Sequence, residues 1–299
     1  LNRGVFPEAG ETDAQRASFG FYEARRLDEN DDGSVSVNYK SFAEAGEHAE
    51  QELARLVEGG HLKKVGTWKM VKERWKEAIA TKIAVLLKER EDGSTKVRFV
   101  VDMRRSGVNG LVTVYERIVL PRGLDLVQGV LDVWEHCSQE VELCVIDFAD
   151  AFLNLKVDPA EQGYVVVVDG KGEYYVYSGV PFGLASAPLL WGRVAAWMAR
   201  AAQAVASPRR ARLQLYVDDP IIAVAGTKAE RDFSLAVILA FWLACGARFS
   251  WNKAMLGKRV KWIGATYEVK RQGIVASIDK DRLAKMQGKV DRMFQEETS

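Results

Sequence analysis

Apolar residues recur along the chain in two periods, one typical of helices and one typical of strands. Helical spacing predicts helices at Phe42–Val57, Leu124–Cys137, Leu184–Val205, Lys228–Cys245 and Ile278–Phe294. Short apolar or alternating runs predict strands at Ile83–Leu87, Lys96–Val101, Val141–Ile146, Tyr164–Val168, Glu173–Tyr177, Leu213–Val217, Ile221–Ala225 and Val260–Val269. The two kinds of element do not alternate regularly, as they would in a parallel sheet. The pattern therefore predicts an α+β fold with an antiparallel sheet packed on helices.

Turn residues separate several of these segments. Asp92-Gly93 and Asp169-Gly170 each lie between two predicted strands, which indicates β-hairpins. Residues 1–40 have weak periodicity and include the polar run Asp28–Ser34, so we expect a loosely folded lead-in there. The chain begins at Leu1 rather than Met, and we interpret it as a piece of a longer product.

Composition places the chain among folded proteins. Of 299 residues, 48% are hydrophobic and 28% are charged, which excludes disordered, collagen-like and coiled-coil classes. The three cysteines have no CxxC or Cys/His spacing, so neither a disulfide framework nor a zinc site is predicted. The longest apolar run, Ala236–Cys245, is too short for a membrane span, which takes about 20 residues. The net charge is only +1, but residues 1–60 carry −7 and the remainder +8, so the basic part can face a polyanion.

Two sites place carboxylates at the ends of apolar strands. Asp218-Asp219 lies between two short strands, and Asp147 ends the strand Val141–Ile146. Because Asp is a favoured turn residue, each site alone is also explained by a polar turn or a cap. If the strands are neighbours, however, three carboxylates converge, and their repulsion favours a hard divalent cation such as Mg²⁺. Three carboxylates are enough for two ions about 3.5–4 Å apart, the arrangement used for phosphoryl transfer.

Six segments then follow one another in a recognisable order. They are KVRFVVDMR at Lys96–Arg104, VIDFADAF at Val145–Phe152, VPFGLASAP at Val180–Pro188, YVDD at Tyr216–Asp219, and the segments Gly246–Lys253 and Val260–Gly264. In this order they resemble the reverse transcriptase domain of retrotransposons and retroviruses, over roughly Glu52 to Phe294. One YxDD box would be a weak signal, whereas six ordered elements are specific. The sequence departs from the family pattern at Arg105–Asn109, where a Leu-Asn pair is usual, and at Pro220.

The resemblance implies a right-hand polymerase with fingers, a palm and the start of a thumb. The implied boundaries are an N-terminal extension at 1–40, fingers at 41–120 and 156–180, palm at 121–155 and 181–272, and the start of the thumb at 273–299. The implied activity is that of an RNA-directed DNA polymerase, which transfers dNTPs onto a primer 3′-hydroxyl. Its partners would be an RNA or DNA template, a nucleic-acid primer and dNTPs, with no membrane; protein partners are left open.

The resemblance also implies which residues carry the chemistry. Asp147, Asp218 and Asp219 would hold two Mg²⁺ ions, with Mn²⁺ as an alternative. Lys253 would approach the pyrophosphate as a candidate general acid. The primer strand would be positioned by Trp262 and Gly264, although core packing explains Trp262 equally well.

A second set of residues would bind the triphosphate of the incoming dNTP. By motif position, the backbone N–H groups of Asp150 and Ala151 would contact it. Arg98 and Lys88 would reach its oxygens from the fingers hairpin, or else lie on a solvated face of that hairpin.

The sugar and base would meet a third set. Phe152 lies where the family has its steric gate, an aromatic ring that leaves no room for a 2′-hydroxyl; the alternative is a core aromatic. Phe182 and Gly183 would form the floor of the pocket, since glycine allows close backbone approach. Trp68 and Trp75, with the lysines around them, would stack on a template strand or, alternatively, be buried under an amphipathic helix.

Three other hypotheses compete with an active reverse transcriptase. An RNA-dependent RNA polymerase shares the palm chemistry, but the aromatic residue Phe152 argues against it. A catalytically inactive or domesticated reverse-transcriptase-like domain would bind nucleic acid only; decay usually removes the carboxylates early, and all three are intact. A structural domain with a chance YxDD box is disfavoured by the ordered motifs.

Overall fold

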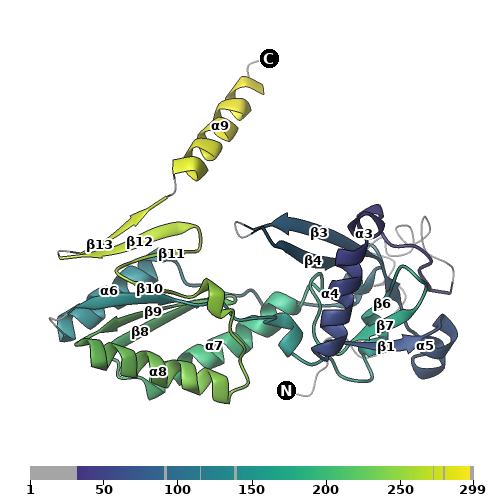
Figure 1. Cartoon of the computed structure of the whole chain (residues 1–299), viewed down its shortest axis with the longest axis horizontal. Coiled ribbons are helices and arrows are strands. Elements are labelled where there is room, and N and C mark those ends of the chain that lie inside the picture. Colours follow the sequence, from purple (N-terminus) through teal and green to yellow (C-terminus); the bar gives the residue numbers. More distant parts are fainter. Residues whose placement is uncertain are drawn as a thin grey trace. The chain divides into compact units, whose positions relative to one another are not determined.

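The computed structural model describes residues 32–90, 93–114, 116–137, 140–271, 273–278 and 280–296. Contacts divide the chain into two compact units (Figure 1). Unit 1 consists of Leu1–Ile118 and Asp150–Trp191, and unit 2 consists of Val119–Ala149 and Gly192–Ser299. Most of the predicted lead-in, and Asp92 of one predicted turn, lie outside the described residues.

Among its described residues, unit 1 combines a mixed sheet with a separate hairpin and three helices. The helices are α3 (Lys40–Ala45), α4 (Glu47–Glu58) and α5 (Trp68–Arg74), with short 3-10 turns η1 (Val108–Leu111), η2 (Phe152–Asn154) and η3 (Gln162–Tyr164). The strands are β1 (Leu62–Gly66), β2 (Ala80–Thr81), β3 (Ile83–Glu89), β4 (Thr95–Val101), β6 (Val166–Val168) and β7 (Tyr174–Tyr177). Within the described residues the sheet order is β1-β7-β6-β2, where only β2 and β6 are parallel, and β3 pairs with β4 as an antiparallel hairpin.

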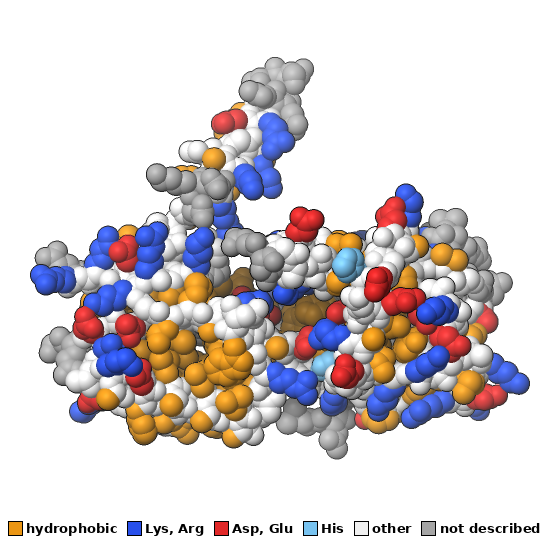
Figure 2. Space-filling model, viewed as in Figure 1, with side chains coloured by type: hydrophobic (Ala, Val, Ile, Leu, Met, Phe, Trp, Pro, Cys, Tyr) orange, Lys and Arg blue, Asp and Glu red, His pale blue; other side chains and the backbone are white. Residues whose placement is uncertain are grey.

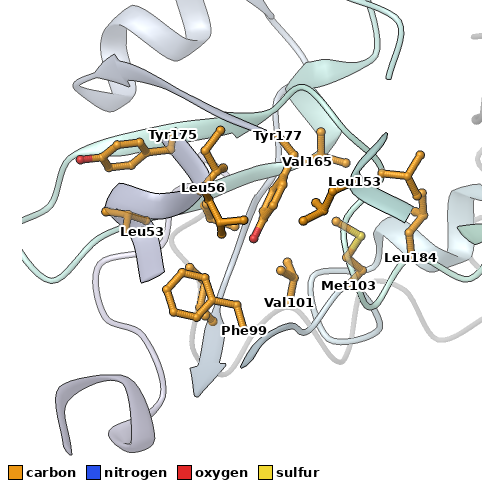
Figure 3. Packing of buried hydrophobic residues seen from close by; sticks show 14 of the residues in the cluster. Leu53, Leu56, Phe99, Val101, Met103, Leu153, Val165, Tyr175, Tyr177 and Leu184 are labelled. Carbon is orange, nitrogen blue, oxygen red and sulfur yellow. The ribbon is translucent and has the colours of Figure 1, made fainter. Parts of the chain in front are cut away.

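The core of unit 1 forms where α4 covers the strands (Figure 3). Leu53 and Leu56 of α4 pack with Phe99 and Val101 of β4 and with Tyr177 of β7. The apolar positions of α4 recur at helical spacing, so that one face of the helix is buried and the other is charged. This core holds β4 in place, the strand that carries Arg98.

The predicted single helix Phe42–Val57 is wrong in one respect. Two helices, α3 and α4, occupy this range, and they meet at Gly46. The φ of Gly46 is 49°, a left-handed conformation that ends the first helix and that glycine adopts at little cost.

Unit 2 contains two antiparallel sheets and four helices among its described residues. The helices are α6 (Gly123–His136), α7 (Ala187–Val205, whose first turn belongs to unit 1), α8 (Lys228–Ala244) and α9 (Lys280–Glu296), with the 3-10 turn η4 (Trp251–Lys253). The strands are β5 (Val141–Val145), β8 (Ala211–Tyr216), β9 (Asp219–Ala225), β10 (Met255–Gly257), β11 (Arg259–Trp262), β12 (Ala265–Lys270) and β13 (Gly273–Ser277). The sheet orders are β10-β5-β9-β8 and β11-β12-β13. Helices combined with antiparallel sheets confirm the predicted α+β fold.

The predicted strand Val260–Val269 is in fact a hairpin. Strands β11 and β12 pair through Trp262 and Ala265, so Ile263 and Gly264 form a two-residue turn. Their φ values are 40° and 81°, as a hairpin turn of this length requires. A β-branched residue such as Ile263 is unusual in that conformation, which is why the sequence pattern looked continuous.

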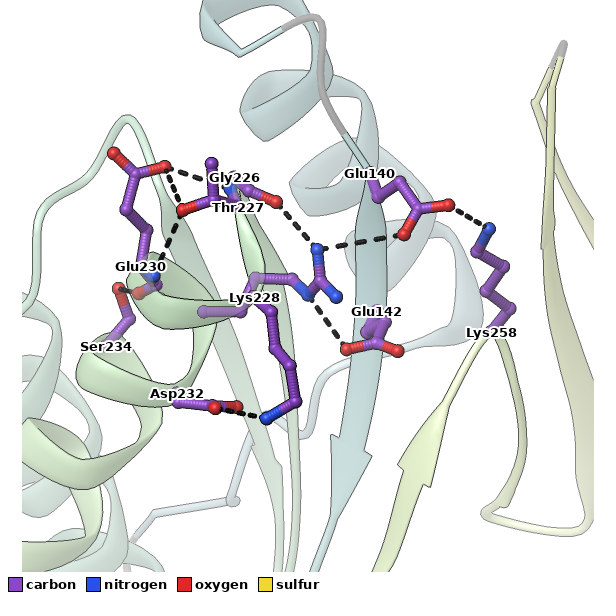
Figure 4. Close-up of polar contacts among 10 residues, drawn as sticks. Glu140, Glu142, Gly226, Thr227, Lys228, Glu230, Asp232, Ser234 and Lys258 are labelled. Atoms are coloured by element: carbon purple, nitrogen blue, oxygen red, sulfur yellow. Dashed lines mark hydrogen bonds and ion pairs between the residues drawn. The ribbon is translucent and has the colours of Figure 1, made fainter.

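A polar network joins α8 to the two inner strands of the larger sheet, β5 and β9 (Figure 4). Arg231 is buried, and its Nε donates to Glu142 of β5 at 2.8 Å while its Nη1 donates to the Gly226 carbonyl at 2.6 Å. Thr227 and Glu230 form a capping box at the start of α8. Because the buried guanidinium of Arg231 is paired in this way, it holds α8 against β5 and β9, the strands next to Asp147 and Asp219.

The surface of unit 2 has an apolar area over α7 and α8, where Figure 2 shows hydrophobic side chains gathered. Exposed members include Trp197, Phe233 and Leu243. Among the described helices, none has the length and apolar character needed to cross a membrane.

Candidate active site

The carboxylate pair lies at a two-residue hairpin between β8 and β9. Tyr216 pairs with Asp219, so Val217 and Asp218 form the turn. The φ of Val217 is 54°, a left-handed conformation that is costly for a β-branched side chain. The predicted hairpin is confirmed, with the difference that Asp219 begins β9 instead of lying in the turn.

Asp147 follows the strand next to this hairpin. Strand β5 pairs with β9, with Val145 opposite Ile221. Just beyond β5, the amide of Phe148 donates to the carbonyl of Asp218 at 3.0 Å. The sequence argument for converging carboxylates depended on these two strands being neighbours, and they are.

The three carboxylates interact electrostatically. Burial, followed by the charges of Asp218 and Asp147, raises the pKa of Asp219 to about 6. Lys253 opposes this rise, because its ammonium group lies close by and pairs with the carboxylate of Asp147. The Asp147 backbone is held as well, since its carbonyl accepts from the Ser250 amide at 2.8 Å. Lys253 and Asp147, 106 residues apart in sequence, are therefore brought together, while the role of Lys253 as a general acid stays a prediction.

The donor chemistry suits a hard divalent cation, since three carboxylates gather where one of them resists ionisation. The positions of these three carboxylates, however, do not form a closed set of metal ligands. Within the described part of the chain, no three His, Cys, Asp or Glu side chains surround one point as metal ligands would. The carboxylate of Asp147 faces Lys253 instead.

Trp262 supports the carboxylate hairpin from the core. Its ring is buried among the apolar side chains of unit 2, and its indole N–H donates to the backbone carbonyl of Asp219 at 2.9 Å. Tyr216 contacts the same ring edge-on, with centroids 6.4 Å apart. The core position is the one that the packing alternative predicted. Gly264 lies in the following turn, where its carbonyl accepts from Arg282 at 2.9 Å; primer binding by these residues stays a prediction.

In unit 1, Asp150 has an unusual backbone and a strong partner. Its φ is 51°, and its carbonyl accepts from the Asn154 amide at 3.1 Å. The guanidinium of Arg55, on α4, donates to both carboxylate oxygens of Asp150, at 2.9 and 3.3 Å. Hydrogen bonds to Glu52 and then to Asp150 raise the pKa of Arg55 above its already high value. Nothing local in the sequence pointed to Arg55.

The aromatic residues of the predicted nucleotide pocket also meet in unit 1. The ring centroids of Phe152 and Phe182 are 5.0 Å apart, and Ala151, which precedes Phe152 in sequence, is buried. Phe152 is half-buried and packs against the core of unit 1. Gly183 has a φ of 116°, and a Cβ there would overlap the carbonyl oxygen of Val101. Only glycine fits this position.

The basic residues of the β3–β4 hairpin share one face. Leu86 is opposite Arg98 and Lys88 is opposite Lys96, so Lys88, Lys96 and Arg98 point to the same side. The guanidinium of Arg98 lies 5.7 Å from the centre of the Phe182 ring. The structure thus brings Arg98 to Phe182, while Lys88 stands farther along the hairpin.

Asn109 is a site residue that sequence reasoning missed. Its side-chain amide donates to the Gly183 carbonyl at 2.9 Å and accepts from the Ala185 amide at 2.8 Å. It therefore clamps the loop that follows Phe182. No local pattern in the sequence pointed to this clamp, because the two contacts join residues that are 74 and 76 positions apart.

Template stacking by Trp75 is wrong. Trp75 is buried, and its indole N–H donates to the Pro159 carbonyl at 2.8 Å. Trp68 packs on Tyr174, with ring centroids 5.1 Å apart. The buried alternative describes this stretch.

The chain is similar to known reverse transcriptases in sequence and in fold. A family model described as reverse transcriptase (RNA-dependent DNA polymerase) matches residues 116–267. A solved structure of the foamy viral protease-reverse transcriptase dRH in complex with double-stranded DNA is similar with a TM-score of 0.60 and 18% identity, covering 93% of this chain and 46% of that chain. The selenomethionine-labelled CSH mutant of the Prototype Foamy Virus protease-reverse transcriptase gives 0.57 and 17%, covering 81% and 28%.

These similarities have defined limits. At such identities the structural matches show the fold, and the chain spans less than half the length of either protein. No curated protein matches the sequence.

Proposed function

The chain belongs to the reverse transcriptase family, and from this premise we propose that it is an RNA-directed DNA polymerase that adds dNTPs to a primer 3′-hydroxyl. The observation that carries the proposal is the meeting of Asp147, Asp218 and Asp219 at adjacent strand ends, where the pKa of Asp219 is raised. A structural relative was solved with double-stranded DNA. We infer that this chain likewise binds a nucleic-acid template and primer, with the fingers in unit 1 and the palm in unit 2.

We propose that the three carboxylates hold two Mg²⁺ ions, or Mn²⁺ in their place. When bound, such ions neutralise the triphosphate and make the primer hydroxyl a better nucleophile. The protein keeps Asp147, Asp218 and Asp219 close together, so that their repulsion favours cation binding. Lys253, which contacts Asp147, is the proposed proton donor to the leaving pyrophosphate.

The proposed nucleotide contacts belong to unit 1. Arg55 neutralises the carboxylate of Asp150, which leaves the backbone N–H groups of Asp150 and Ala151 suited to bind an anion. Arg98 and Lys88 supply positive charge from one face of their hairpin. Phe152 excludes the 2′-hydroxyl.

Primer extension tests the proposal. The 299-residue chain is given an RNA template, a DNA primer, Mg²⁺ and dNTPs, and is compared with Asp218→Asn. We expect extension by the natural chain and a loss of at least about a hundredfold in the variant. Asp158→Asn, which changes an exposed aspartate of unit 1, is the matched control and should extend normally.

Each failure has a separate meaning. Normal extension by Asp218→Asn would refute the proposal that Asp218 is one of the metal-binding carboxylates. A natural chain that binds template-primer without extending it would support the binding-only alternative. Preference for ribonucleotides over dNTPs would favour an RNA-dependent RNA polymerase.

A further inference from the structure

One of the points at which the backbone that carries Phe152 is held is the carbonyl of Leu153. Phe152 begins the short turn η2, and Leu153 is buried directly after it. Leu153 is adjacent to Phe152 in the same short turn, so a displacement of the Leu153 backbone is expected to move the Phe152 ring as well. Two residues outside the predicted pocket, Gly179 and His61, contact this carbonyl.

The backbone of Gly179 lies close to the Leu153 carbonyl, and no side chain would fit between them. A Cβ at Gly179 would lie 2.8 Å from the carbonyl carbon of Leu153 and 2.9 Å from its Cα, and would overlap the carbonyl oxygen. Ordinary contacts begin at 3.4 Å, and these neighbours are backbone atoms that cannot rotate away. The φ of Gly179 is not in the left-handed region, so space alone requires glycine here.

His61 contacts the same carbonyl through a hydrogen bond. Its Nδ1 lies 3.2 Å from the Leu153 oxygen, and because a carbonyl only accepts, Nδ1 carries the proton. The imidazole is buried. Losing this donor would leave a buried carbonyl with one partner fewer.

His61 and Gly179 belong to one rigid block. The amide of Ser178 donates to the His61 carbonyl at 2.9 Å, and the Ser178 hydroxyl donates to the Gly60 carbonyl at 2.5 Å. Lys156 and Gly179 form an isolated antiparallel bridge, which ties the end of the Phe152 segment to the same block. The block therefore holds the segment both laterally and at its end.

We propose that Gly179 and His61 are positioning residues that set the discrimination between deoxyribo- and ribonucleotides. They act through Leu153 on the placement of Phe152 and do not touch the nucleotide. The inference rests on the proposed function, since it assigns a further determinant to the same pocket.

The test measures selectivity, the ratio of kcat/KM for a dNTP to that for the matching rNTP, by single-nucleotide primer extension. Gly179→Ala should lower this ratio by about tenfold or more, because displacements near 1 Å at a reacting geometry have effects of that order. Gly170→Ala is the matched control. A Cβ there makes an ordinary 3.7 Å contact with Phe42, and the ratio should not change.

A second pair of variants tests the hydrogen bond and remains informative if Gly179→Ala does not fold. His61→Phe removes the donor and should lower the ratio. His61→Asn can place an amide N–H near the same position and should restore most of it. A purely structural role would instead reduce dNTP and rNTP incorporation together and leave the ratio unchanged.

The variant Phe152→Val distinguishes failure of the proposed function, failure of the gate assignment and failure of the positioning role of Gly179 and His61. Absence of extension by the natural chain would count against the proposed function. If Phe152→Val gains no ribonucleotide incorporation, the gate assignment fails. A changed ratio in Phe152→Val with an unchanged ratio in His61→Phe and in any folded Gly179→Ala would overturn the present inference.

Discussion

Replacing Asp219 by asparagine should stabilise the metal-free protein while abolishing polymerase activity. The pKa of Asp219 is raised from 3.8 to about 6 by burial and by its acidic neighbours, so the folded protein prefers the protonated carboxyl. This rise corresponds to at most about 3 kcal/mol. Because the carboxyl is only half-buried, solvent screening reduces the figure to about 1–2 kcal/mol. The asparagine side chain removes the repelling charge and leaves the backbone carbonyl that accepts from Trp262 in place.

The sign of the pH dependence follows from the raised pKa. Below the unfolded value of 3.8 the carboxyl is protonated in both states and costs nothing. As the pH rises toward 6, the unfolded chain releases the proton more readily, and the natural protein loses stability relative to the variant. The gain from Asp219→Asn should therefore be complete near pH 7.5 and fall to roughly a third of that at pH 4.5.

Thermal melting in a chelating buffer measures this effect. At pH 7.5 the variant should melt about 2–5 °C higher than the natural chain. Added Mg²⁺ should raise the melting temperature of the natural chain and narrow the difference. Asp291→Asn, on the exposed face of α9, is the control and should leave the melting temperature unchanged. A variant no more stable than the natural chain at pH 7.5 without divalent ions would refute the reasoning.

Three other substitutions give distinct outcomes. Arg55→Met removes two hydrogen bonds to Asp150, a half-exposed ion pair that contributes about 1 kcal/mol. The KM for dNTPs should therefore rise about fivefold with little change in kcat. An unchanged KM would contradict the proposed role of Arg55. Gly183→Ala places a Cβ against the Val101 carbonyl at a positive φ, so it should lower the melting temperature and stop primer extension. Normal extension would show that the loop after Phe182 can move to accept the Cβ. Glu230→Gln removes a carboxylate whose pKa is lowered to about 2 by Arg210 and then Thr227. The natural chain should be the more stable in urea at pH 7, the difference should vanish as the pH falls from about 4.5 toward 2, and a difference independent of pH would exclude this ionic contribution.

The carboxylate hairpin could be predicted because its signals are local. Asp218 and Asp219 interrupt two apolar runs, and both the chain reversal and the burial follow from that pattern alone. The helix break at Gly46 and the turn at Ile263 could not be predicted in this way. One glycine is tolerated in many helices, and an isoleucine gives no sign of a positive φ.

The supporting contacts were beyond sequence reasoning for a different reason. Arg55 meets Asp150 across 95 residues, His61 meets Leu153 across 92, and Asn109 meets Gly183 across 74. Arg55, His61 and Asn109 are common polar residues, and two of their partners are backbone carbonyls, so each contact exists only after the fold has formed. Such contacts leave no periodic trace in the chain, so only the fold reveals them.

The division into units also has a consequence for how this chain is made and handled. Each unit consists of two separate stretches of sequence, and one crossing falls between Ala149 and Asp150, inside a single motif. A nascent chain leaving the ribosome cannot finish unit 1 before residues 150–191 have emerged, by which time the first stretch of unit 2 has already been synthesised. Simple truncation therefore yields neither unit whole, and dissecting this protein into parts calls for circular permutation or for a linker that bridges residues 118 and 150.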